Sequence, residues 1–104
     1  MASTNPNVIE RGKEGVSTKQ PPLYQVLLHN DHYTTMEFVV EILVRIFHKS
    51  FPAANHIMLS VHHTGVGVCG VYTYEIAETK VKTVLQIAEQ NGFPLLCTFE
   101  KVDE

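Results

Sequence analysis

Apolar residues follow two different periods in the first half of the chain. Over residues 23–29 they alternate with other residues, which predicts a β-strand with one buried face. After a polar loop, Thr34 and Glu37 match a capping box, in which a hydroxyl and a carboxylate bond the free N–H groups of a helix start. We therefore expect a helix from this point to about residue 48. Its apolar stripe at helical spacing consists of Met36, Val39, Val40, Leu43, Ile46 and Phe47.

A second helix and a second strand are predicted in the middle of the chain. Ser50 and Pro52 are typical of a helix start, and Gly65 can adopt the left-handed conformation that ends a helix. The inward positions of this helix are Ile57, Met58 and Val61. Residues 66–72 are apolar throughout, which is typical of a central strand covered on both faces.

The last third of the chain predicts one more helix and one more strand. Apolar residues recur at helical spacing from about residue 74 to residue 90, and Asn91, Gly92 and Pro94 are typical of a helix end. The inward positions are Ala77, Val81, Val84, Leu85 and Ala88. Residues 95–100 supply the last strand. The predicted fold is therefore α+β, with the order β-α-α-β-α-β and three helices against one side of a three-stranded sheet.

The N-terminal segment differs in composition from the rest of the chain. Residues 1–20 contain no aromatic side chain and few branched aliphatic ones, so burial there cannot offset the entropy of ordering. We expect a flexible tail over residues 1–20 and a single folded domain over residues 21–104. The sequence starts without the basic and then apolar regions of a secretory signal. No stretch approaches the ~20 apolar residues that a membrane span requires.

Charge and cysteine usage narrow the class of function. The formal net charge is −3, and the 8 Lys and Arg residues are scattered rather than clustered. Because nucleic acid selects clustered cations, we expect no nucleic-acid partner. Cys69 and Cys97 lie in separate apolar runs. A disulfide between them stays open, but two buried thiols in a reducing cytoplasm fit this pattern better.

The 6 histidines make metal binding the first chemistry to consider. His29 and His32 are close in sequence, but they leave a strand rather than a helix, so their spacing does not bring them onto one face. A zinc site requires three or four converging ligands, and neither cysteine has a zinc-like spacing to another ligand. We predict no metal and no cofactor, and a small metal-binding domain stays as an alternative.

Catalytic motifs are absent from the sequence. It contains no phosphate-binding loop, serine elbow or paired-carboxylate motif. A thiol nucleophile requires an oriented base, and Cys69 or Cys97 would meet His62 only if the fold joined them. Apolar surroundings raise the pKa of a thiol and reduce its reactivity. We predict that the protein is not an enzyme.

The loop after the first strand has the composition of a binding site. Asn30 offers an amide oxygen, Asp31 a carboxylate and a neutral His62 a ring nitrogen, and all three can accept from a free N-terminal ammonium. The neighbouring apolar residues that suit a large first side chain are Met36, Val39, Met58, Val61 and Leu95. The same pattern is also typical of an ordinary turn beside core residues, so both interpretations stay open at this point.

Several segments in order resemble the ClpS family, adaptors that deliver N-degron substrates to the ClpA unfoldase of the ClpAP protease. These segments are Tyr-Gln-Val-Leu-Leu-His-Asn-Asp at 24–31, Met-Glu-Phe-Val-Val at 36–40, Ile-Met-Leu-Ser-Val-His at 57–62, Gly-Val-Cys-Gly-Val at 67–71, Ala-Glu-Thr-Lys-Val at 77–81 and Pro-Leu-Leu-Cys-Thr at 94–98. The resemblance covers residues 22–101. It implies a fold like that of the C-terminal domain of the ribosomal stalk protein, in agreement with the predicted order of elements.

The resemblance also implies a role for individual residues. Asn30, Asp31 and His62 match positions that hold the α-ammonium of a client peptide. The positions that match a pocket for a first residue of leucine, phenylalanine, tyrosine or tryptophan are Thr34, Met36, Val39, Met58, Val61 and Leu95. Within that pocket, Met36 matches a gate that disfavours β-branched first residues. The implied function is an adaptor for N-degron substrates, and the alternative is a metal-binding or structural interaction domain without this specificity.

Two positions match a partner contact, and two others depart from the family pattern. Glu75 and Lys80, on the polar side of the third helix, match positions that contact the ClpA N-terminal domain, whereas the residues alone indicate a solvated face. The family usually has Asn-Asp-Asp-Tyr-Thr-Pro-Met where this chain has Asn-Asp-His-Tyr-Thr-Thr-Met. His32 replaces an acidic residue and Thr35 a rigid proline, so we expect both to modulate specificity and the loop to be less fixed.

Overall fold

The computed structural model describes residues 21–103, and the predicted order of elements is confirmed there. The elements are β1 (Leu23–His29), α1 (Met36–Arg45), α2 (Phe51–Thr64), β2 (Val66–Thr73), α3 (Tyr74–Gln90) and β3 (Leu96–Lys101). The tail predicted over residues 1–20 lies outside the described residues. None of the helices in the described range is long and apolar enough to cross a lipid bilayer.

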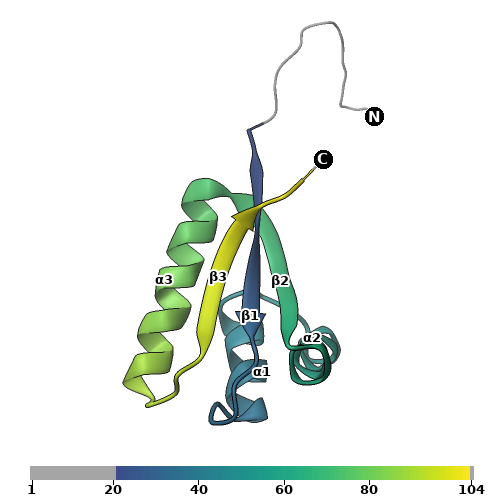
Figure 1. Cartoon of the computed structure of the whole chain (residues 1–104), viewed down its shortest axis with the longest axis vertical. Helices are drawn as coiled ribbons and strands as arrows, with labels where there is room; N and C mark the ends of the chain where they lie inside the picture. The colour runs from purple at the N-terminus through teal and green to yellow at the C-terminus, as the bar shows by residue number, and fades with distance from the viewer. Residues whose placement is uncertain (1–20, 104) are drawn as a thin grey trace, which may run out of the picture.

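The sheet has one covered and one open face. Its strand order is β2-β1-β3, and both neighbouring pairs are antiparallel. In Figure 1 no helix crosses in front of the sheet, and α1 passes behind β1. Val66, Val68 and Leu96 are exposed on the open face. The prediction that residues 66–72 form a central strand covered on both faces is therefore wrong, because β2 is an edge strand with alternating burial.

Helix α1 begins and ends at residues that differ from the prediction. Its N-cap is Thr35, whose hydroxyl accepts from the backbone N–H of Phe38 at 3.1 Å. The predicted capping box of Thr34 and Glu37 is wrong, since the Thr34 hydroxyl donates to Asp31 instead. The helix ends at Arg45 rather than near residue 48.

Helix α2 has the caps that the sequence predicts. The Ser50 hydroxyl accepts from the backbone N–H of Ala53 at 3.3 Å, and Pro52 occupies the first turn. At the other end, Gly65 has a φ of 94° and its N–H donates to the Val61 carbonyl at 3.0 Å. Glycine adopts this left-handed conformation without steric cost, so the chain turns directly into β2.

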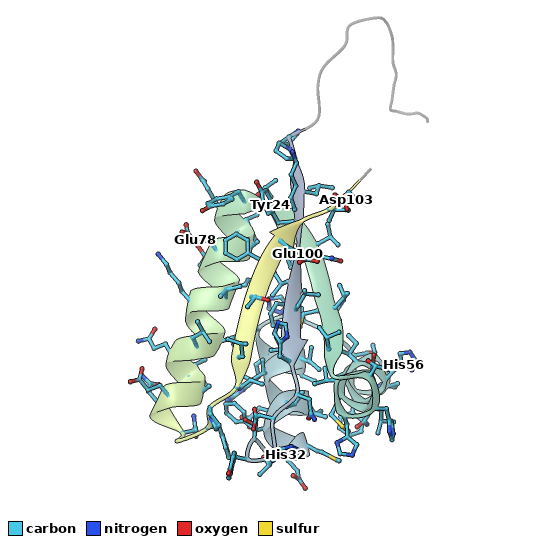
Figure 2. All side chains as sticks on the ribbon, viewed as in Figure 1. Tyr24, His32, His56, Glu78, Glu100 and Asp103 are labelled. Carbon is cyan, nitrogen blue, oxygen red and sulfur yellow. The ribbon has the colours of Figure 1, made fainter. Side chains whose placement is uncertain are left out.

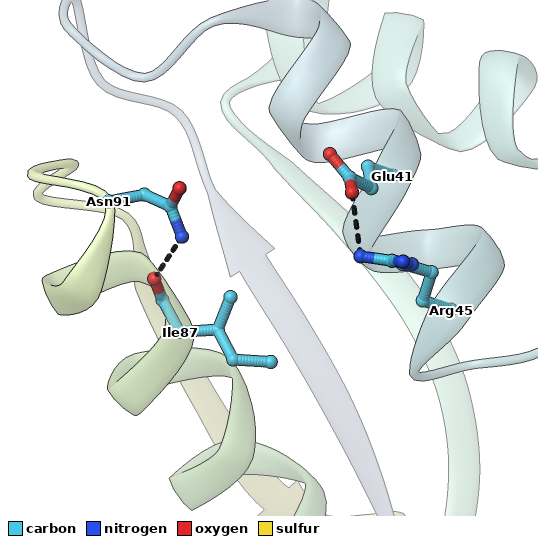
Figure 3. Close-up of polar contacts among 4 residues, drawn as sticks. All are labelled: Glu41, Arg45, Ile87 and Asn91. Carbon is cyan, nitrogen blue, oxygen red and sulfur yellow. Dashed lines mark hydrogen bonds and ion pairs between the residues drawn. The ribbon is translucent and has the colours of Figure 1, made fainter.

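The core lies between the covered face of the sheet and the helices. Its most completely buried large side chains are Leu28, Leu43, Val26, Val84 and Cys69. Phe38 of α1 packs against Phe93, with ring centroids 4.7 Å apart. The inward stripe predicted for α3 is confirmed except at Leu85, which is 39% exposed. At the end of α3, the Asn91 side-chain amide donates to the Ile87 carbonyl at 2.8 Å (Figure 3).

Candidate binding site

A cavity of about 370 Å³ lies where the loop after β1 meets α1 and α2. Its lining residues are Asn30, Asp31, His32, Thr34, Met36, Val39, Met58, Val61 and His62. The structure thus brings together, from three separate segments of the chain, residues that the sequence predicts for one site. Figure 2 shows His32 at the end of the molecule opposite Tyr24, Glu100 and Asp103.

Asp31 holds the loop in shape through three hydrogen bonds. One carboxylate oxygen, Oδ1, accepts from the backbone N–H groups of Tyr33 and Thr34, each at 2.7 Å. The other oxygen, Oδ2, accepts from the Thr34 hydroxyl at 2.7 Å. A carboxylate has about four lone-pair sites, so these three bonds leave one acceptor site of Oδ2 unused. Asp31 therefore holds the loop as far as Thr34, the residue before the N-cap of α1.

The same hydrogen bonds control the charge of Asp31. Partial burial by itself raises the pKa of this carboxyl. The hydrogen bonds from Thr34 and Tyr33, together with the neighbouring His32, lower the pKa by more than burial raises it. The net effect is a pKa below the ordinary aspartate value of 3.8. N–H and O–H donors favour the charged form because they complement its negative oxygens. Asp31 is therefore an anion at neutral pH and presents a fixed negative charge to the cavity.

A backbone contact ties the loop to the end of α2. The N–H of Asn30 donates to the carbonyl of Gly65 at 2.9 Å. Gly65 caps α2, so this bond sets the distance between Asn30 and the last turn, where His62 lies. His62 is exposed, and its ring meets that of His63 edge-on with centroids 5.2 Å apart. The polar end of the cavity is thus assembled from two segments that this bond and the adjoining β1–β2 pairing hold together.

The other end of the cavity has an apolar wall, made by four side chains of α1 and α2. Val39 of α1 and Met58 and Val61 of α2 are buried, and they belong to the same core cluster as the covered face of the sheet. Met36 lies at the rim and is 42% exposed. The arrangement presents hydrogen-bond acceptors at one end and a hydrophobic recess beside them. Such a site suits a ligand that combines a cation with an adjoining apolar group.

Two predicted site residues lie away from this cavity. Leu95 is buried in the core, and its side chain is not part of the cavity lining. Thr35 serves as the N-cap of α1 and also lies outside the lining. Its φ of −74° is close to the value that proline imposes, so this backbone would accept a proline as well as the threonine present.

The two residues of α3 that match a partner contact have different surroundings. Glu75 is exposed in the first turn of the helix. Lys80 is half-buried, and its Nζ donates to the Ile46 carbonyl at 2.8 Å. The ammonium also lies 5.7 Å from the ring centroid of Phe47 and 5.4 Å from that of Tyr72. Lys80 therefore links α3 to the end of α1 and is not the simple solvated position that the residue pattern indicates.

Neither cysteine has the environment of a nucleophile. Cys69 and Cys97 are free thiols, as expected, and both are buried. Burial raises the pKa of both thiols, that of Cys97 to about 12. A thiol in this state is protonated at neutral pH and reacts slowly.

The surroundings of His29 are not those of a metal ligand. His29 is engaged through its Nε2 with the Thr98 hydroxyl, at 2.8 Å. Among residues 21–103, no three histidine, cysteine or carboxylate side chains lie together as a metal site would need. A zinc site requires at least three such ligands, so the geometry of the described chain favours hydrogen bonding over coordination at His29.

Comparison of the sequence with known families and proteins gives consistent matches. Residues 19–98 match the family described as ATP-dependent Clp protease adaptor protein ClpS. The ATP-dependent Clp protease adapter protein ClpS of Lawsonia intracellularis is 62% identical over 86 residues, which cover 83% of this chain and 79% of that protein. The protein of the same name from Desulforapulum autotrophicum is 52% identical over 103 residues, or 97% of this chain and 99% of the relative.

A solved structure matches the fold as well as the sequence. ClpS2 of Agrobacterium tumefaciens, bound to L-phenylalaninamide, superimposes with a TM-score of 0.77. The two chains are 38% identical, and the match covers 80% of this chain and 100% of that one. At this identity the likeness extends beyond a shared fold to a shared family.

Proposed function

This chain belongs to the ClpS family of ATP-dependent Clp protease adaptors, which are not enzymes, and we propose that it binds the N-termini of N-degron substrates. The ligand is a free N-terminal amine together with a bulky first side chain of leucine, phenylalanine, tyrosine or tryptophan. The observation that carries the proposal is the cavity in which charged and polar acceptors adjoin apolar walls. The bound substrate is then delivered to the ClpA unfoldase of the ClpAP protease.

The polar end of the cavity supplies what a desolvated ammonium requires. An ammonium has three donors, and its transfer out of water is unfavourable unless acceptors meet them. On this proposal Asn30 accepts through its amide oxygen, Asp31 through the unused site on Oδ2, and His62 through a ring nitrogen, directly or through water. The charge of Asp31 strengthens its hydrogen bond, because charge-assisted bonds are about twice as strong as neutral ones.

The apolar end of the cavity supplies a pocket for the first side chain. Val39, Met58 and Val61 form buried walls, and Met36 lies at the entrance, where a side chain branched at Cβ would meet it first. Burial of a large apolar side chain contributes about 1.5–3 kcal/mol relative to leaving it in water. On this proposal, tight binding needs both a free amine and a large first residue. L-phenylalaninamide, the ligand of the Agrobacterium ClpS2 structure, contains both groups.

We assign delivery to parts of the protein away from the cavity. Glu75 and Lys80 of α3 are proposed to contact the ClpA N-terminal domain, and residues 1–20 to act on the unfoldase during hand-over. Because the cavity and α3 are separate surfaces, the adaptor can hold a peptide and its partner at the same time. The two free, buried thiols support a reducing compartment, and we place the protein in the cytoplasm.

Fluorescence anisotropy with a peptide series tests the proposal. The peptides are identical except for the first residue, and each is prepared with a free and with an acetylated N-terminus. We expect binding of free leucine, phenylalanine, tyrosine and tryptophan termini, and a loss of at least about tenfold on acetylation, since the charged hydrogen bonds are removed. Equal binding of free and acetylated peptides would contradict the proposal.

A second assay addresses hand-over and the alternative function. In degradation assays with purified ClpAP, a protein lacking residues 1–15 should bind peptide normally but fail to deliver it. Full delivery by that truncated protein would show that the tail has no role.

Zinc titration in competition with peptide tests the alternative that the protein is a metal-binding domain. A metal held by Asp31 and His62 would displace the amine of the peptide.

A further inference from the structure

A second cavity lies beside the first and shares two of its walls. It has a volume of about 360 Å³ and lies between the first turn of α1 and the start of α2. Met36 and Met58 line both cavities, so the two methionines form the partition between them. The other lining residues are Glu37, Val40, Phe51 and Asn55. The second cavity is therefore a direct neighbour of the proposed peptide site, separated from it by these two side chains.

The walls of the second cavity present apolar surface to solvent. Phe51 is the first residue of α2, and it is 64% exposed. Met36, on the α1 side of the cavity, is exposed as well. Val40 of α1 is half-buried and lies between the core and the cavity. Large apolar side chains gathered in an open recess are typical of a surface that another molecule covers.

A single charge accompanies this apolar surface. Glu37 is the charged residue of the lining, and it is exposed. Within residues 21–103 the ion pairs join Arg45 to Glu41 and Lys82 to Glu78, so the Glu37 carboxylate has no cation beside it there. The complementary occupant is a side chain with a long aliphatic stem and a cationic end. Its stem would cover the methionine and valine, and its cation would meet the Phe51 ring and the Glu37 carboxylate.

The geometry of an extended peptide determines which of its side chains can reach the second cavity. Side chains of an extended chain alternate between two faces, so the first and third residues point the same way, about 7 Å apart. A peptide whose first side chain enters the first cavity thus directs its third side chain to the same face of the protein. Resting on the proposed function, we infer that the second cavity binds the third residue of the client and selects arginine or lysine there.

The test measures affinities of peptides that begin with phenylalanine and differ at one later position. Arginine, alanine or glutamate is placed at position 3, and arginine is also placed at position 2 or 6 as a register control. Binding is measured for the full-length protein and for Glu37→Gln, Phe51→Ala and Glu41→Gln. The last variant is the matched control, since Glu41 lies one turn further along α1, paired with Arg45 at 2.9 Å (Figure 3).

The expected result is a gain confined to position 3 and dependent on the second cavity. Arginine at position 3 should bind about threefold to tenfold tighter than alanine, the range for an exposed ion pair with a cation–π contact. Glutamate there should bind more weakly than alanine. The gain should fall in Glu37→Gln and in Phe51→Ala, and it should persist in Glu41→Gln.

Other outcomes overturn the inference, and they separate it from the proposed function. An equal gain for arginine at position 2 or 6, or a gain that survives Glu37→Gln, would assign the effect to general charge attraction. If free phenylalanine peptides bind and acetylated ones do not, while position 3 has no effect, the amine site stands and only the second cavity is refuted. If no free N-terminus binds, both proposals fail together.

Discussion

Helix α3 lies against all three strands along a buried stripe, whereas α1 and α2 enclose two cavities where they meet. Ala77, Val84 and Ala88 of α3 are at most 1% exposed, and they pack on the covered face of the sheet. Between α1 and α2, by contrast, lie recesses of about 370 and 360 Å³ with Met36 and Phe51 exposed at their edges. On our proposal, the close interface accounts for stability and the open one for peptide recognition. Substitutions on the two sides should therefore have separable effects.

The largest effect is expected from a substitution in the closely packed core. Leu28→Ala, at a fully buried position of β1, should lower the free energy of unfolding by about 2–5 kcal/mol, because it removes apolar contacts and leaves a cavity. Met36→Ala at the cavity rim should lower it by less than about 1 kcal/mol. Urea unfolding measures both. Similar losses for the two variants would contradict the division between the interfaces.

Asp31 should dominate peptide affinity. Asp31→Ala removes both the clamp on the loop and a charged acceptor, so the expected loss is about 1.5–3 kcal/mol, or tenfold to a hundredfold in affinity. Asp31→Asn retains an oxygen for the backbone N–H groups of the loop, but an NH2 group replaces Oδ2, so the variant loses the charge and the acceptor of the Thr34 hydroxyl together. Titration of a phenylalanine peptide into both variants measures the two contributions. A wild-type affinity in Asp31→Ala would exclude this carboxylate from the site.

A side chain at position 67 should disturb both the packing of α2 on the sheet and the binding site. A Cβ at this position would lie 2.7 Å from Val61 Cγ2 and 3.3 Å from the Ile57 carbonyl oxygen, so in Gly67→Ala the Val61 side chain, or α2 with it, must shift. We expect a loss of about 1–3 kcal/mol in stability, typical of overpacking, together with weaker peptide binding. Val68→Thr, at an exposed neighbour, is the control for unfolding and binding. Unchanged binding in Gly67→Ala would show that the position of α2 does not matter to the site.

Substitution of Lys80 should lower the stability of the fold without changing peptide affinity. Lys80→Met leaves the Ile46 carbonyl without its side-chain donor, which should cost about 0.5–1.5 kcal/mol in thermal or urea unfolding. Lys82→Met, at an exposed position of the same helix, should have almost no effect. A loss of peptide affinity in Lys80→Met would mean that the two interfaces are not independent.

The smallest effect concerns the pH dependence of stability. The pKa of Asp31 in the folded protein is below its ordinary value of 3.8, so the unfolded chain binds the proton first as pH falls. The stabilisation from Asp31 is therefore fully present above that value and is lost as pH falls through the folded pKa. The difference in unfolding free energy between the wild type and Asp31→Asn should shrink as pH is lowered from 6 toward acid. A difference independent of pH would contradict the clamp.

The order of elements and most of the cavity lining were predictable from the sequence. Periodicity locates a helix or strand well, because the buried face must repeat with the geometry of the element. The caps Ser50 and Gly65 were identified for the same reason, since each has a specific local bond to make. The resemblance to one family then connected residues of the loop and of α2, which lie far apart in the sequence.

The errors have a common physical cause, which is that tertiary contacts override a local pattern. Thr34 followed by Glu37 reads as a capping box, but Asp31 takes the Thr34 hydroxyl and moves the helix start by one residue. The apolar run of residues 66–72 does not indicate whether its strand is central or at an edge, because one open face of a sheet can be apolar too. Lys80 is half-buried because it bonds the end of α1. The pattern of apolar residues along α3 cannot predict that contact, since it contains no information about α1.

The most direct test of the account is a map of the amides that respond to a phenylalanine peptide. Two-dimensional ¹⁵N–¹H NMR spectra of the full-length protein are recorded during titration with the free peptide and with its acetylated form. We predict shifts over residues 30–36 and 58–62 with the free peptide only, while amides of α3 such as Val84 stay unmoved. Shifts centred on α3 or on the open face of the sheet, or equal shifts with the acetylated peptide, would contradict the assignment of recognition to the α1–α2 interface.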